Sequence, residues 1–216
     1  MNARADLTPE RFRPMHETAA RYYGDRIREF GATHRGVDWS TEASQILRFG
    51  QLLRLVDPAQ LSGINDFGCG YGALVTYLRQ LGCQCRYTGF DISESMIAHA
   101  MSLHAADRLC SFTTNLDAVE RAEFTVASGV FNVKQNYGDG DWQDYVLANI
   151  ATMDRLSERG FAFNMLSSYS DAARRRADLF YGTPGFFFDY CKTNFSSAVA
   201  LLHDYPLYEF TIVVRK

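Results

Sequence analysis

The chain has 216 residues, of which 47% are hydrophobic and 22% are charged, with 22 lysines and arginines against 25 aspartates and glutamates. This composition can bury a core, so it excludes a disordered chain, and the length fits one domain with an extension. A net charge of −3 without a basic stripe argues against a nucleic-acid partner.

The first ten residues lack the apolar core of a signal peptide, and no apolar run approaches the length of a membrane span. The five cysteines include no CxxC pair, which favours a reduced protein without a zinc site. We therefore expect a cytoplasmic protein that binds no membrane.

Residues 1–58 are predicted to form a helical cover. Thr8 and Pro9 are a typical capping residue and a typical first helical residue, so the first helix should begin there. Ser40 or Thr41 would cap a second helix, whose apolar positions recur at helical spacing and should face inward.

From residue 59 onward, strand-like and helix-like segments alternate. Strands are predicted at 62–67, 85–90, 109–113, 124–128 and 160–165, helices at 73–81, 94–103 and 142–156, helical or irregular segments at 171–181 and 185–195, and closing strands at 198–202 and 209–214. This alternation predicts a doubly wound α/β domain with a mainly parallel sheet. The closing strands are joined by a short turn and must be antiparallel.

The most informative motif follows the first predicted strand. Asp66 precedes a turn with alternating glycines at positions 68, 70 and 72, and the next strand ends at Asp91. The glycines permit a tight turn and let a ligand lie directly on the backbone. A carboxylate about 20 residues after the first glycine can accept hydrogen bonds from both ribose hydroxyls. Asp91 could alternatively cap the helix that follows it.

Two details favour a methyl donor over a dinucleotide as the ligand of this motif. The loop reads GxGxG instead of GxGxxG, and the carboxylate of Asp66 would oppose a pyrophosphate at the helix start. An acidic residue in this position instead suits a ligand that carries an ammonium group.

Residues 62–216 resemble the class I S-adenosylmethionine-dependent methyltransferases, in particular the small bacterial stand-alone enzymes. The resemblance rests on the 66–72 segment, on Asp91 and on the closing antiparallel strands. It implies an α/β fold with a seven-stranded, mainly parallel sheet and an antiparallel last strand. It also implies S-adenosylmethionine as the cofactor and S-adenosylhomocysteine as the product.

The same resemblance implies roles for individual residues. Asp66 and the glycine loop would hold the methionine part of the donor, and Asp91 would bind the ribose. The loop glycines are Gly68, Gly70 and Gly72. Contacts to the adenine are implied for Ile92, Met96, Asn115 and Leu116, and a contact to the methionine part for Ser128. In the family the position of Asn115 is often acidic, and Met96 could equally be a core residue.

In similar methyltransferases an N-terminal segment folds over the donor. Tyr23 and Trp39 would then approach the sulfonium, because the face of an aromatic ring attracts positive charge. Arg48 would pair with the donor's carboxylate. Alternatively, Trp39 anchors the packing of the cover and Arg48 forms a surface ion pair.

Ligands of such sheets bind outside the carboxyl ends of the parallel strands. His203, in the turn between the two closing strands, is the predicted general base, and Asn132 and Tyr169 are predicted to orient the acceptor. His16 and His34 in the cover are alternative bases. A turn histidine bonded to the backbone is the structural alternative for His203.

The turn after the fourth strand, 128–132, lacks the Asn-Pro-Pro-Tyr type of motif found in enzymes that methylate nucleobase amines. By elimination, the predicted reaction is methyl transfer to an oxygen or nitrogen of a small-molecule acceptor, in a natural-product or sugar pathway, by a monomer or homodimer. The alternatives are a catalytically silent donor-binding partner subunit and an NAD-dependent oxidoreductase.

Overall fold

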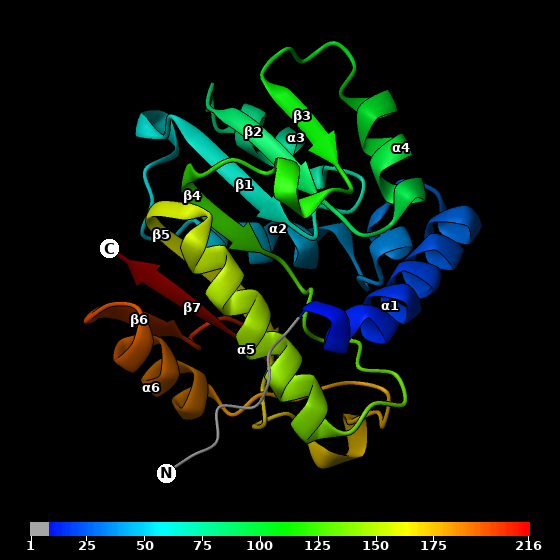
Figure 1. The fold of residues 1–216 in the computed structure, drawn as a ribbon, viewed down its shortest axis with the longest axis vertical. Coiled ribbons are helices and arrows are strands. Elements are labelled where there is room, and N and C mark those ends of the chain that lie inside the picture. Colours follow the sequence, from blue (N-terminus) through cyan, green and yellow to red (C-terminus); the bar gives the residue numbers. More distant parts are fainter. Residues whose placement is uncertain (1–8) are drawn as a thin grey trace.

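The computed structural model describes residues 9–216, which form one seven-stranded sheet with helices on both faces (Figure 1). The strand order is β3-β2-β1-β4-β5-β7-β6. The strands are β1 (Gly63–Phe67), β2 (Arg86–Phe90), β3 (Cys110–Thr113), β4 (Ala122–Ala127), β5 (Ser157–Leu166), β6 (Ala198–Leu202) and β7 (Glu209–Arg215). The helices are α1 (Pro9–Phe30), α2 (Glu42–Leu52), α3 (Ala73–Gln80), α4 (Glu94–Leu103), α5 (Asp139–Arg155) and α6 (Pro184–Asn194).

The sheet has the predicted topology. β1 pairs in parallel with β2 and β4, β2 with β3, and β4 with β5, whereas β7 is antiparallel to both β5 and β6. The parallel strands therefore all end at one edge, where β1, β2 and β4 run into the loops of the glycine motif, Asp91 and Ser128. The predicted fold class is confirmed.

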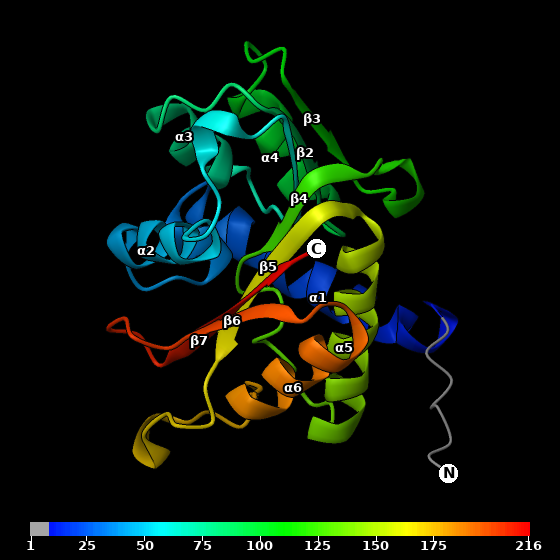
Figure 2. The ribbon, with the colours of Figure 1, turned by 90° about the vertical axis from the view of Figure 1, so that its left-hand side faces the viewer.

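Two apolar layers hold the helices on the sheet. Helices α2 and α3 cover one face, and α5 and α6 cover the other, as Figure 2 shows from the side. The layer under α5 and α6 includes several aromatic side chains that are almost fully inaccessible, among them Phe131, Trp142 and Phe161. Burying an aromatic or aliphatic side chain of this size contributes about 2 kcal/mol, so this rigid double core fixes the edge that carries the loops.

Within the predicted N-terminal cover, α1 lies across the carboxyl ends of the strands, whereas α2 packs on a face of the sheet. Helix α1 contacts α4 and the short helix η1 (His34–Val37), and its first turns reach α5. Thr41 caps α2, because its hydroxyl accepts a hydrogen bond from the backbone N–H of Ser44 at 3.1 Å. Thr8, the predicted cap of α1, lies outside the described residues. No helix among residues 9–216 is both long and apolar enough to cross a membrane.

Candidate functional site

The glycine turn after β1 has the backbone conformation that only glycine adopts without strain. Gly68, Gly70 and Gly72 have φ angles of 79°, 55° and 81°. A Cβ atom on Gly68 would lie 2.4 Å from Cγ2 of Val130, which belongs to the turn after β4. The glycines therefore allow the loops after β1 and β4 to approach each other. Gly72 itself caps α3 and packs against His104, away from the cavity described below.

Asp91 ties the end of β2 to the glycine turn. One carboxylate oxygen accepts a hydrogen bond from the backbone N–H of Gly70 and the other from that of Ser93, both at 2.9 Å. Burial raises the pKa of Asp91, and these two hydrogen bonds partly offset that effect. Asp91 thus anchors the glycine turn and supports the start of α4. Because each carboxylate oxygen can accept more than one hydrogen bond, both oxygens can still accept from a ligand.

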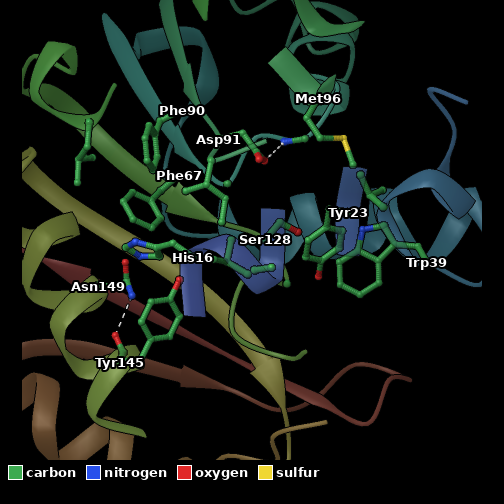
Figure 3. Close-up of a pocket in the computed structure, with 18 residues that line it drawn as sticks. His16, Tyr23, Trp39, Phe67, Phe90, Asp91, Met96, Ser128, Tyr145 and Asn149 are labelled. Carbon is green, nitrogen blue, oxygen red and sulfur yellow. Dashed lines mark hydrogen bonds between the residues drawn. The ribbon is translucent and has the colours of Figure 1, made fainter. Parts of the chain in front are cut away.

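A cavity at this edge is covered by α1 (Figure 3). His16, Ala19 and Tyr23 are spaced by three and four residues, so they form one stripe of α1 that lies along the cavity. From the loops, the cavity is lined by Phe67, Gly68, Gly70, Phe90, Asp91, Ile92, Leu116, Ser128, Gly129 and Val130. Its remaining walls are Val37, Trp39, Met96, Tyr145 and Asn149.

The segment between α1 and α2 closes one end of the cavity with Val37 and Trp39. Asp38, between them, has a left-handed φ of 63° and a side chain that faces α1. Its carboxylate accepts a hydrogen bond from the Tyr22 hydroxyl at 2.7 Å and forms an ion pair with Arg26 at 2.8 Å. These contacts fix the strained backbone that directs Val37 and Trp39 into the cavity.

Asp66 lines a smaller adjoining cavity, and the residues that line both cavities include Trp39 and Ser128. Asp66 is 3% exposed, and its carboxylate accepts a hydrogen bond from the Tyr87 hydroxyl at 2.7 Å. Burial raises the pKa of Asp66 to about 7, although the Tyr87 hydrogen bond acts in the opposite direction. Nearby, the buried Ser128 hydroxyl has no hydrogen-bond partner among the described residues. This end of the site thus offers a titratable carboxylate and a free hydroxyl.

Arg48 does not line either cavity. Its guanidinium donates two hydrogen bonds to Glu209 on β7, at 2.8 and 2.5 Å, and a third to the backbone oxygen of Ser44 at 2.8 Å. One face of the guanidinium lies 3.8 Å from the centre of the Trp39 ring. The predicted contact of Arg48 with a ligand carboxylate would therefore have to compete with its ion pair to Glu209. The alternative prediction was a surface ion pair, but the pair that Arg48 forms is buried.

The predicted acceptor residues lie apart from the cavity. Asn132 accepts a hydrogen bond from the backbone N–H of Leu166 at 2.9 Å and so joins the loop after β4 to the end of β5. The rings of Tyr169 and His203 pair at 5.8 Å near the β6 edge, and Tyr169 is 75% exposed. Asn115 caps a short helix and is exposed, also outside the cavity. His34 lies in η1, in a separate surface cleft.

Sequence reasoning missed Tyr145 and Asn149, which face the cavity from α5 four residues apart. The side-chain nitrogen of Asn149 donates to the Tyr145 backbone oxygen at 2.8 Å, so the carbonyl oxygen is the atom of this amide that can accept from a ligand. His16, expected only as an alternative base, packs edge-on against the Tyr145 ring, and burial lowers its pKa. The sequence signal that could have identified such residues is a polar side chain on the otherwise apolar, inward-facing side of an amphipathic helix.

Comparisons with known proteins agree with this architecture. Residues 64–152 match the family described as a methyltransferase domain. The chain is 44% identical over 164 residues to Rv1506c of Mycobacterium tuberculosis, a protein whose name assigns it provisionally to the methyltransferases. This match covers 76% of the chain and 99% of that protein.

Solved structures share the fold at low identity. A DhpI complex with SAH has a TM-score of 0.61 at 15% identity and covers 93% of this chain and 96% of its own. A SAM-dependent methyltransferase of Leishmania major has a TM-score of 0.62 at 14% identity, and the match covers 98% of this chain and 88% of that protein's chain. Together with the mycobacterial relative, these findings confirm the resemblance seen in the sequence: the chain belongs to the class I S-adenosylmethionine-dependent methyltransferase family.

Proposed function

We propose that the cavity under α1 binds S-adenosylmethionine and that the protein transfers its methyl group to an oxygen or nitrogen of a small-molecule acceptor. The observation that carries this proposal is Asp91, a buried carboxylate that anchors the glycine turn and borders the cavity. A ribose laid there would meet the carboxylate, while the rest of the donor would extend along the stripe of α1.

Three features of the chain fit this donor. The glycine turn has no side chains where the ligand would lie on the backbone. The free hydroxyl of Ser128 and the carboxylate of Asp66 adjoin one end, where they would receive the ammonium group of the methionine part. Apolar side chains dominate the other end, which suits a purine ring.

Asp66 should make donor binding depend on pH. An ammonium group bound beside it favours the ionised carboxylate, so binding lowers a pKa that is about 7 in the free protein. Affinity for S-adenosylhomocysteine should therefore rise as the pH increases from 5.5 to 8, by about tenfold if the pKa falls by about one unit. Calorimetry across this range measures the effect.

The contribution of Asp66 to the free energy of unfolding changes with pH in the opposite direction to its contribution to donor affinity. Its pKa is raised above the ordinary value of 3.8, so the protonated form favours the fold, and this contribution diminishes between pH 3.8 and about 7. Binding must therefore be compared at temperatures where the protein is fully folded. D66N, which is neutral at every pH, should bind more weakly and with a flatter pH profile. An unchanged slope in D66N would contradict the assignment.

The apolar end of the cavity, where the purine ring would lie, also offers polar groups that complement adenine. The carbonyl oxygen of Asn149 can accept from the exocyclic amine, and the imidazole of His16, whose pKa burial lowers, can donate from one nitrogen to a ring nitrogen. Asn115, the sequence-based candidate, is exposed outside the cavity. We therefore assign recognition of the base edge to α1 and α5.

This assignment predicts nucleobase selectivity. The native protein should bind S-adenosylhomocysteine at least about tenfold more tightly than S-inosylhomocysteine, which presents a carbonyl in place of the amine. In N149L, which removes the amide and keeps the bulk, that ratio should fall toward one. N194A, which removes the exposed amide of Asn194 on α6, is the matched control. If N149L kept the full ratio, the base would be read by other groups.

Tyr23 is better placed than Trp39 to face the sulfonium. Burial raises the pKa of its phenol, and the negative charges of Asp38 and Asp91 raise it further; these two carboxylates would favour a cation beside the ring. One face of Trp39 already carries the guanidinium of Arg48. The Tyr23 ring would therefore contribute a cation–π contact to the charged donor that the neutral product does not receive.

The donor supplies an activated methyl group on a sulfonium. The chain's own residues hold the ends of the donor, cover it with α1 and exclude water from it. The sequence predicts His203 as the base, with Asn132 and Tyr169 beside the acceptor, and His16 is the histidine that lines the cavity. Small-molecule acceptors from natural-product and sugar pathways remain our proposal.

The proposed activity is tested by incubating the protein with methyl-labelled S-adenosylmethionine and a panel of hydroxylated and aminated small molecules, including sugars. Labelled product with an oxygen or nitrogen acceptor, lost in D91N, would support it. Donor binding without transfer to any acceptor in the panel would instead favour a silent donor-binding subunit.

A further inference from the structure

The ion pair between Arg48 and Glu209 joins the last strand to the wall of the cavity. Glu209 begins β7 and pairs through its backbone with Leu166 at the end of β5, so the sheet fixes its position. Its side chain is 2% exposed and that of Arg48 is 8% exposed. Both oxygens of the carboxylate are occupied by the guanidinium, which fixes the orientation of the guanidinium plane.

That plane lies against Trp39. The guanidinium carbon is 3.8 Å from the centre of the indole, within the range of a strong cation–π contact. The far edge of the indole reaches the turn after β4, where a Cβ on Gly129 would lie 2.2 Å from Cη2 of Trp39. Trp39 is thus held between a fixed cation and a glycine that makes room for it.

A buried ion pair is poor evidence of stabilisation, because the cost of removing two charges from water offsets their attraction. What this pair does provide is a fixed direction for one ring. We propose that Arg48 and Glu209 are positioning residues, which act through Trp39 to shape the donor cavity at its methionine end. This inference rests on the proposed donor binding, and it makes β7, at the end of the chain, part of the donor site.

The test replaces the pair without leaving a lone buried charge. R48M/E209M keeps similar volumes and should remain folded, since an apolar pair avoids the cost of desolvation. Affinity for S-adenosylhomocysteine should fall about tenfold, which corresponds to about 1.4 kcal/mol, because the Trp39 ring would no longer be held in the cavity wall. The matched control is R79M/D107M, which removes an arginine–aspartate pair joined at 2.8 Å and away from both cavities.

A spectroscopic readout separates positioning from stability. The chain has two tryptophans, so the indole N–H region of a nitrogen-15 spectrum contains two signals, and W39F assigns them. In R48M/E209M the Trp39 signal should broaden or split, while that of Trp142 stays unchanged. If the double variant does not fold, E209Q, which keeps the size of the side chain, carries the same readouts.

A folded variant with native affinity and an unchanged Trp39 signal would overturn the proposal and leave the pair a purely structural one. If the native protein fails to bind S-adenosylhomocysteine, the proposed function fails, yet the Trp39 signal still shows whether the pair orients the ring. Weakened binding together with a disturbed Trp39 signal, absent in R79M/D107M, is the expected result.

Discussion

D91N is expected to weaken binding of S-adenosylhomocysteine by about a hundredfold or more. A carboxylate can accept charge-assisted hydrogen bonds from both ribose hydroxyls, and each such bond contributes about 1.5 to 3 kcal/mol. The amide has one acceptor oxygen, and Asp91 already uses both of its oxygens to hold Gly70 and Ser93. The variant therefore loses ligand contacts and loosens the glycine turn, which calorimetry detects as a higher Kd.

D107N is the matched control for this loss. Asp107 also accepts from a backbone N–H, that of Leu109 at 3.0 Å, but it pairs with Arg79 away from the cavity. D107N should shift the unfolding temperature while leaving the affinity unchanged. If D91N bound the ligand as the native protein does, Asp91 would be only a structural anchor and the proposed ribose site would be wrong.

G129A is expected to abolish donor binding nearly completely. Gly129 has a φ of 71°, which costs a residue with a Cβ about 1 kcal/mol. The added Cβ would also lie 2.2 and 2.3 Å from two carbons of Trp39, so the indole must leave its place in the cavity wall. Thermal unfolding and calorimetry together separate the general loss of stability from the loss of the site.

G82A isolates the backbone effect. Gly82 has a similar φ of 76°, but a Cβ there would meet no atom within 4 Å. The two variants should share the conformational cost, and only G129A should lose the ligand. Equal affinities in the two variants would show that Trp39 can move without affecting the site.

The parts of the fold that depend on local pattern were predictable from the sequence. Alternating strand and helix segments, with a short turn between the last two strands, were enough to give the parallel sheet and its antiparallel end. The glycine turn and Asp91 were also recognisable, because a tight turn and a carboxylate after the next strand must converge at the same edge. The structure brings Gly68, Gly70, Asp91, Ile92 and Leu116 to one cavity.

The contributions of the helices to the site were less predictable, because they depend on packing between distant segments. Nothing local to Arg48 indicates a partner 161 positions later in β7. Tyr145 and Asn149 belong to an ordinary amphipathic helix, and only the path of α1 over the sheet makes them part of the cavity. The sequence placed His203 and Tyr169 at the edge where ligands bind, but that edge is wide, and the structure places them near β6, apart from the cavity.

The central claim is that this cavity binds the methyl donor, and a calorimetric titration of the native protein with S-adenosylhomocysteine, with NADH titrated in parallel, tests it most directly. The structure leads us to expect saturable binding of one S-adenosylhomocysteine per chain and no binding of NADH. Failure to bind S-adenosylhomocysteine, or preferential binding of NADH, would contradict the proposed site and its function.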